Sequence, residues 1–245
     1  MPSLLDRLAY RRTLRRWRRL SGTEPAEVLR GERRAAREAE REIAAARRRI
    51  KAGLPPAPVT APLHADWAWR PPVFDRALEL SGLASPESGA TLSPEVSVFH
   101  DCTLAEFSLR QCRNTGRDSV SRHGLALEVL GFEGSYLSLA IAVPDAGILG
   151  LSPHHVLRVA PSCEAERDIR AYARLNLRTG PDTKTILREF PVRGLPAEVD
   201  FDLAHEGFQE GQISRAWVDL IFENPALNRI TLRDVTLSRR PRADL

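Results

Sequence analysis

The chain has 245 residues, a net charge of +4, 42% hydrophobic residues and 28% charged residues. This composition is typical of a globular protein and excludes a collagen-like, low-complexity or highly charged disordered chain. The charge is uneven, because residues 1–53 hold 16 Lys or Arg against 7 Asp or Glu. A basic N-terminal arm therefore precedes an acidic remainder.

The sequence shows no sign of export or of membrane insertion. The chain has three cysteines, Cys102, Cys112 and Cys163, and no two of them have C-x-x-C spacing. No apolar stretch of signal-peptide length follows the N-terminus, and no run approaches the roughly 18 to 20 apolar residues of a membrane-spanning helix. We expect cytoplasmic synthesis without a signal peptide, so that a role outside the cell requires lysis or an unconventional route.

Two helices are expected in the basic arm, residues 1–53. Ser3–Leu20 interleaves apolar residues with seven arginines at a spacing that favours a basic amphipathic helix. Thr23 can cap a second helix, Thr23–Ala52, whose apolar residues recur every seven positions. The apolar positions expected to serve assembly are Leu8, Trp17, Leu29, Ile43 and Ile50.

Residues 54–94 are expected to form a proline-rich linker and a tryptophan segment. Trp67 and Trp69 are two residues apart, so an extended chain directs both rings to the same side. One interpretation is a stacking platform for a sugar ring, with polar support from Asp66 and Arg70. The other is that the two rings attach the linker to the following domain, since aromatic residues chiefly supply buried area.

From Glu95 onward the hydrophobic period changes to two, which indicates half-buried strands. Turn signals such as Asn224-Pro225 separate them, and no long helical pattern intervenes. About ten strands result, and they predict a mainly β, antiparallel sandwich or jelly roll over residues 95–245. The expected strands are Val96–Phe99, Leu104–Leu109, Leu125–Phe132, 137–143, Val156–Val159, 169–177, Ile186–Val192, 199–203, 216–222 and Ile230–Leu237.

Motifs that carry chemistry are missing from the sequence. Neither a Gly-rich phosphate loop nor a G-x-S-x-G nucleophile elbow occurs, and no metal-ligand spacing is recognisable. We therefore expect no cofactor, no metal site and no enzymatic activity. One alternative stays open, a nucleophilic Cys102 with His100 or His123 brought near it by the fold; Cys112 and the pair His154-His155 complete this group of residues.

Carboxylates are plentiful on and beside the expected strands: Asp200, Asp202, Glu206, Asp219, Glu223 and Asp234. The candidates for a site are Asp200, Asp202, Asp219 and Asp234. A solvated strand face is the simplest interpretation, and a structural cation site is a second. The alternative function is a carbohydrate-active hydrolase, which needs two such carboxylates facing each other across a cleft.

The basic arm admits three partners: a nucleic-acid backbone, an anionic membrane or an acidic protein surface. No nucleic-acid-binding motif is present, which disfavours specific readout of DNA or RNA. Arginine in preference to lysine, together with the seven-residue apolar repeat, favours a protein surface.

Two stretches of the chain resemble known families. Ser214–Phe222, the turn at Glu223-Asn224-Pro225 and Asn228–Leu237 resemble the last strands of the galactose-binding-like jelly rolls of carbohydrate-binding modules. His100-Asp101-Cys102, Leu109–Gln111, Arg113–Thr115, Ala173–Asn176 and Ser238–Leu245 resemble an alphaproteobacterial family that we connect with the head spikes of gene transfer agents. These are phage-like particles whose spikes bind capsular polysaccharide.

The expected function is therefore non-enzymatic binding or assembly. The sandwich would bind a glycan, such as a cell-surface polysaccharide, or a neighbouring subunit. The arm would attach it to protein subunits of a larger assembly, which the second resemblance identifies as a released phage-like particle.

Overall fold

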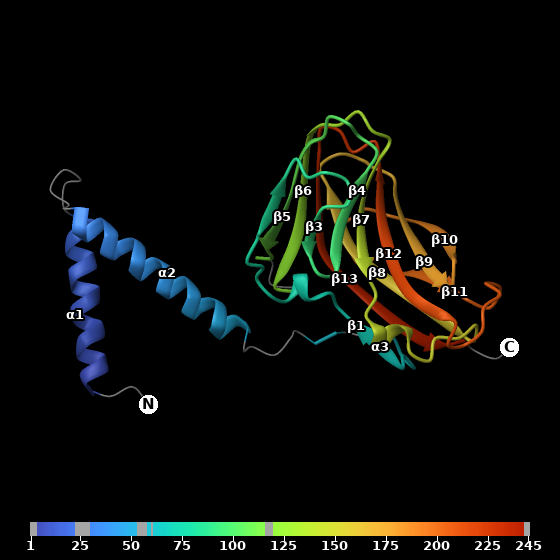
Figure 1. Ribbon diagram of the computed structural model, residues 1–245, viewed down its shortest axis with the longest axis horizontal. Coiled ribbons are helices and arrows are strands. Elements are labelled where there is room, and N and C mark those ends of the chain that lie inside the picture. Colours follow the sequence, from blue (N-terminus) through green and yellow to red (C-terminus); the bar gives the residue numbers. More distant parts are fainter. Residues whose placement is uncertain (1–3, 23–29, 53–57, 60, 116–119, 243–245) are drawn as a thin grey trace. The chain divides into compact units, whose positions relative to one another are not determined.

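The computed structural model describes residues 4–22, 30–52, 58–59, 61–115 and 120–242. The chain forms two compact units, Met1–Leu54 and Pro55–Leu245. The first contains two helices and the second a β-sandwich (Figure 1). The division falls within one residue of the predicted end of the arm at residue 53.

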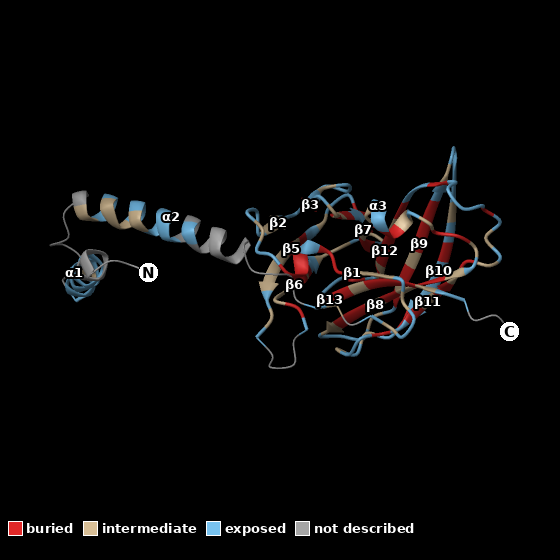
Figure 2. Ribbon diagram, turned by 90° about the horizontal axis from the view of Figure 1, so that it is seen from below, coloured by how far each residue is buried: buried red, intermediate tan, exposed pale blue. Residues whose placement is uncertain are grey.

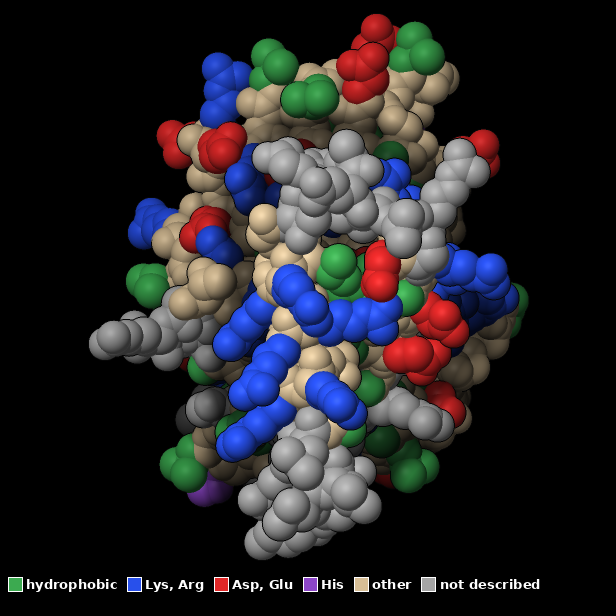
Figure 3. All heavy atoms as spheres, turned by 90° about the vertical axis from the view of Figure 1, so that its left-hand side faces the viewer, with side chains coloured by type: hydrophobic (Ala, Val, Ile, Leu, Met, Phe, Trp, Pro, Cys, Tyr) green, Lys and Arg blue, Asp and Glu red, His purple; other side chains and the backbone are tan. Residues whose placement is uncertain are grey.

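The arm consists of α1, Leu4–Ser21, and α2, Arg30–Ala52. Arg16 of α1 forms an ion pair with Glu32 of α2, with Nη2 and Oε2 2.6 Å apart. Basic side chains gather on the side of the arm that Figure 3 turns to the viewer. The first predicted helix is thus present, whereas the predicted cap at Thr23 lies outside the described residues. Neither helix, over its described residues, is long and apolar enough to cross a membrane.

The predicted assembly positions differ in what the structure describes of them. Trp17 is half-buried, with the guanidinium of Arg16 5.7 Å from its ring centroid. Ile43 is exposed. The side chains of Leu8 and Ile50 and the whole of Leu29 lie outside the described part of the arm. Their role in assembly stays a prediction.

The second unit is the mainly β sandwich that the sequence predicts, and it contains all ten expected strands. One sheet has six strands in the order β10-β9-β12-β7-β4-β3. The other has seven, in the order β11-β8-β13-β6-β5-β2, with β1 also paired to β13. All pairs are antiparallel. The strand bounds are β1 Trp67–Trp69, β2 Gly82–Ala84, β3 Thr91–Ser93, β4 Val96–His100, β5 Glu106–Arg113, β6 His123–Gly131, β7 Tyr136–Ala142, β8 His155–Ala165, β9 Ala171–Thr179, β10 Asp182–Phe190, β11 Val199–Asp202, β12 Ile213–Glu223 and β13 Asn228–Pro241.

Residues 54–94 do more than link the arm to the sandwich, which corrects the predicted start of the domain at residue 95. They contribute β1, β2 and β3 to the two sheets, and the short 3₁₀ helix η2, Pro72–Phe74, to the core. Each of these strands has only three residues. Alternation over three residues is too short to reveal a strand in the sequence.

The core lies between the two sheets, whose inward positions are buried (Figure 2). Strand β12 supplies Ala216, Val218, Leu220 and Phe222 to it, each fully buried. Strand β13 contains a bulge between Leu232 and Asp234, where two of its residues oppose one on β8. The core residues of β13 are therefore Ile230 and Leu232 before the bulge and Val235 and Leu237 after it. Asp234 consequently projects from the outer face of the sheet. A short helix, α3 (Asp145–Ile148), follows β7.

Candidate functional site

The outer face of the six-stranded sheet carries aromatic and polar side chains from two neighbouring inner strands, β9 and β12. On β9 and β12, the residues between the core positions project outward. They pair across the strands as Arg215 with Arg178, Trp217 with Asn176, Asp219 with Arg174 and Ile221 with Tyr172. We call these eight residues the six-strand face.

A hydrogen-bonded cluster occupies the centre of the six-strand face. Arg174 donates to Asp219 Oδ2 from Nη2 at 2.8 Å and from Nε at 2.9 Å. Asn176 Nδ2 donates to the same oxygen at 2.9 Å. Asp219 is 4% exposed and Asn176 2% exposed, while Arg174 remains partly open to solvent. The cluster therefore presents a fixed guanidinium whose Nη1 donors have no acceptor among the described residues.

Flat rings and small side chains surround this cluster. Trp217 is half-buried beside Asn176, and Tyr172 is half-buried beside Ile221. The neighbouring strand β7 places Ser138, Ala140 and Ala142 opposite Ile221, Asp219 and Trp217.

Beyond them, Tyr136 at the start of β7 and Phe99 on β4 are exposed. Aromatic surface next to fixed hydrogen-bonding groups is the combination that binding sites for small polar ligands use.

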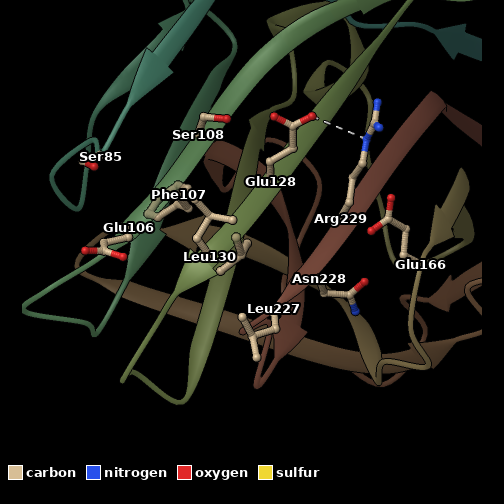
Figure 4. A pocket seen from close by; sticks show the side chains of 11 residues that line it. Ser85, Glu106, Phe107, Ser108, Glu128, Leu130, Glu166, Leu227, Asn228 and Arg229 are labelled. Atoms are coloured by element: carbon tan, nitrogen blue, oxygen red, sulfur yellow. Dashed lines mark ion pairs between the residues drawn. The ribbon is translucent and has the colours of Figure 1, made fainter.

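A second candidate is a groove of about 650 Å³ on the outer face of the seven-stranded sheet (Figure 4). Its side chains come from β5, β6, β13 and the adjoining turns. The exposed Leu130 and Leu227 lie in it, beside Glu106, Glu128 and Glu166. The remaining lining residues are Ser85, Phe107, Ser108, Val129, Asn228 and Arg229.

Ion pairing determines the chemistry of this groove. Glu128 Oε1 lies 2.7 Å from Arg110 Nη2 and 3.6 Å from Arg229 Nε. The hydrogen bond from Arg110 holds the pKa of Glu128 below its ordinary value. An ionised Glu128 cannot act as a general acid at neutral pH. Phe107 is buried, so the groove offers no aromatic face of its own.

The four residues that the sequence suggests for glycan binding, Asp66, Trp67, Trp69 and Arg70, all contact the sandwich. Trp67 and Trp69 pack partly buried against the core, with ring centroids 6.4 Å apart. Asp66 accepts a hydrogen bond from Arg239 Nε at 3.0 Å, and Arg70 lies buried against Asp234. This placement agrees with the alternative interpretation, attachment of the segment to the sandwich. A glycan-binding role for these four residues stays a prediction.

The four candidate carboxylates are divided between the sheets, and each is paired with an arginine. Asp219 lies on β12, whereas Asp200, Asp202 and Asp234 belong to the seven-stranded sheet. Their arginine partners are Arg158 and Arg240 for Asp200, Arg242 for Asp202, Arg174 for Asp219 and Arg70 for Asp234.

His100, Cys102 and Cys163 are buried, whereas Cys112 is partly buried and His154 is exposed. The ring nitrogens of His100 lie 3.1 Å and 3.0 Å from the carbonyl oxygens of Cys102 and Pro86. Cys102 Sγ donates to the Leu104 carbonyl at 3.1 Å, and burial raises the pKa of Cys163 to about 12. Within the described residues, Cys102 forms no hydrogen bond to a histidine ring, and no cluster of three or more His, Cys, Asp or Glu suits a metal ion.

The six-strand face is not predicted by the sequence, although its residues are recognisable as strand residues. The available signal is the set of positions between the apolar ones. In β12 those positions hold Arg215, Trp217 and Asp219, and in β9 they hold Arg174, Asn176 and Arg178. Their convergence depends on the pairing of β9 with β12, which the sequence does not show.

Comparisons with known proteins place the chain as follows. The profile of a family of unknown function, DUF6478, matches residues 1–245. No curated protein matches the sequence.

Among solved structures, the enzymatically active domain of bacteriophage CBA120 tailspike protein 4 aligns at 9% identity and TM-score 0.42 over 62% of this chain, but the alignment spans only 21% of the tailspike chain. The CBM22-1 xylan-binding domain of Paenibacillus barcinonensis Xyn10C aligns at 8% identity and TM-score 0.40, over 67% of this chain and 96% of its own. TmCBM61, solved with β-1,4-galactotriose, aligns at 13% identity and TM-score 0.37, over 63% and 97%. TM-scores of this size carry no argument about function.

Proposed function

The chain belongs to the family DUF6478, whose description names no activity, and we propose from the geometry that its six-strand face binds a glycan. The observation that carries the proposal is the cluster of Arg174, Asn176 and Asp219 beside Trp217. Three polar groups are fixed there by hydrogen bonds next to an aromatic ring.

The chemistry of this cluster suits a sugar. A pyranose ring offers an apolar face of C–H groups and a rim of hydroxyls, so it needs a flat hydrophobic surface with donors and acceptors at the edge. Tyr172 supplies such a surface, and Trp217 supplies the part of its ring that Arg215 does not cover. Arg174 supplies donors, and the buried Asp219 and Asn176 hold its guanidinium and backbone in place. Preorganised groups of this kind lose little entropy when a ligand binds.

We propose further that the protein binds without catalysing a reaction. Hydrolysis of a glycoside requires two carboxyl groups across one cleft, one of them protonated. On the six-strand face the carboxyl group of Asp219 is already bonded to Arg174 and Asn176. This supports a role in positioning rather than in acid catalysis.

The arm extends the proposal to assembly. Its excess of arginine and its exposed apolar residues, such as Tyr10 and Ile43, suit an acidic protein surface with apolar patches. We propose that the arm attaches the sandwich to a larger assembly. On the resemblance described above, this assembly is the head spike of a phage-like particle.

A binding experiment with matched variants tests the glycan proposal. The full chain is applied to an array of bacterial capsular and plant polysaccharides, beside Trp217→Ala and Tyr172→Ala. Loss of one stacked aromatic ring is expected to weaken binding about tenfold. Tyr10→Ala, which removes an exposed ring from the arm, is the control and should bind as the native protein does.

Two outcomes would overturn the proposal. One is a folded protein that retains no glycan. The other is glycan binding that survives both ring substitutions on the six-strand face but is lost in Leu130→Ser, because the site would then be the groove of the seven-stranded sheet.

A further inference from the structure

Two arginines face each other on the six-strand face at the end nearest the β9–β10 turn. Arg178 on β9 and Arg215 on β12 are directly opposite in the antiparallel register, and both are exposed. Ser214 Oγ donates to the Arg178 carbonyl at 3.2 Å, which joins the two strands at this point. Like charges directly opposite each other destabilise a sheet.

Neither guanidinium is neutralised by a carboxylate within the described residues. Arg178 Nε donates to the carbonyl of Gly180 at 3.4 Å. Arg215 lies over the ring of Trp217, with its Cζ 5.5 Å from the centroid. Both side chains are thus held in place by uncharged groups.

Two other arginines, Arg174 on β9 and Arg170 just before β9, are paired with carboxylates. Arg174 pairs with Asp219 at 2.8 Å, and Arg170 pairs with Glu223 at 2.8 Å. Of the three arginines on the six-strand face, Arg174 has a carboxylate partner, whereas Arg178 and Arg215 have none within the described residues. An anionic ligand group between them would remove the repulsion and form charge-assisted hydrogen bonds with both.

We propose that the glycan bound by the six-strand face is acidic, and that Arg178 and Arg215 bind its carboxylate groups. This inference rests on the proposed function and specifies its ligand class, a polymer that contains uronic acids. The position fits, because Trp217 and Asn176 are the next pair along β12 and β9. A sugar seated at Trp217 therefore has the two guanidinium groups as its neighbours.

The test compares each acidic polymer with its own uncharged form. Polygalacturonate, alginate and hyaluronan are each offered to the full chain beside their carboxyl-reduced derivatives, and affinities are measured by calorimetry at two salt concentrations. The native protein should bind at least one acidic polymer about tenfold more tightly than its reduced form, because both exposed arginines would gain an ion pair. This preference should shrink at high salt.

Variants locate the effect. The double variant Arg178→Gln with Arg215→Gln should lose the preference for the acidic form and keep its binding of the reduced form. Arg193→Gln removes an equally exposed arginine from the connection before β11 and should keep the preference.

The outcomes separate this inference from the proposed function. Equal binding of acidic and reduced polymers by the native protein overturns the inference and leaves glycan binding intact. A preference that survives in the double variant also overturns it, because the acidic group would then be bound elsewhere. If the folded protein binds no polymer of the set and no glycan of the array, both proposals fail together.

Discussion

The buried ion pair between Arg70 and Asp234 provides a quantitative test of how the segment before the sandwich is attached. Arg70 Nε lies 2.8 Å from Asp234 Oδ1, and Nη2 lies 3.2 Å from Oδ2. The two side chains are 2% and 6% exposed. The substitution Arg70→Met keeps much of the volume and leaves two buried carboxylates without this cation, Asp234 and also Asp75, whose Oδ1 lies 3.9 Å from Arg70 Nη1.

The expected loss of stability follows from the burial of this pair. Removal of one partner of a buried ion pair costs about 3 to 5 kcal/mol, because the remaining charge stays desolvated. For a domain of this size a loss of about 3 kcal/mol lowers Tm by about 6 to 12 °C. The double variant Arg70→Met with Asp234→Leu removes the two charges of this pair, retains only Asp75 of the buried carboxylates around it, and should be more stable than Arg70→Met alone.

The stability that Arg70→Met loses should depend on pH, because Asp234 can take up a proton. Burial raises the pKa of Asp234 above its ordinary value even with Arg70 present, and loss of Arg70 should raise that pKa further. A carboxyl whose folded-state pKa is raised favours the folded state at low pH, and this advantage is lost as the pH rises through that pKa. The deficit of Arg70→Met should therefore be largest at neutral pH and shrink towards about pH 4.

Urea unfolding of the full chain, followed by tryptophan fluorescence at several pH values, measures these quantities without adding salt. A deficit below about 1 kcal/mol at neutral pH, or one that does not change with pH, would refute the reasoning.

Three further predictions concern stability and domain organisation. The hydrogen bond from Arg158 keeps the pKa of Asp200 low, so this pair should stabilise the fold above about pH 4 and lose its effect as the pH falls through the lowered pKa. In Arg158→Gln the free energy of unfolding, measured with urea, should therefore depend less on pH over that acid range. The difference from the native protein should be under about 1 kcal/mol, because the pair is partly exposed. Gly147→Ala would place a methyl group 2.6 Å from the ring of Trp67, and calorimetry should show a loss of about 1 to 3 kcal/mol that is partly recovered when Trp67→Phe is added. A chain that begins at Pro58 should stay soluble, show a β-rich circular dichroism spectrum and melt cooperatively but no longer enter its larger assembly; unfolding of this chain would show that the arm belongs to the core.

The strands of the sandwich could be predicted because their periodicity reports burial directly. In β9 and β12 every second residue is apolar over at least four positions, and one sheet face buried against the other requires this pattern. Strands β1 to β3 are too short for such a pattern, so the sequence predicts only a linker and a tryptophan segment over residues 54–94. The bulge at Asp234 moves the buried positions of β13 from even-numbered to odd-numbered residues. Nothing in the local sequence shows that a bulge causes this change.

The candidate site was less accessible from the sequence, because a site on a sheet is formed by neighbours that are distant in the chain. Arg174 and Asp219 are 45 residues apart, and only the pairing of β9 with β12 brings them together. The sequence draws attention to Trp67 and Trp69 because they are close together in the chain. The single outward Trp217 stands in an otherwise ordinary strand.

Amide hydrogen exchange in the presence of a glycan selected from the array tests the central claim most directly. If the six-strand face binds the glycan, saturation should slow exchange at backbone amides of β9 and β12, around Asn176 and Trp217, with little change elsewhere in the sandwich. Slower exchange confined to β5 and β6, around Ser108 and Glu128, would instead place the ligand in the groove of the seven-stranded sheet and contradict the account.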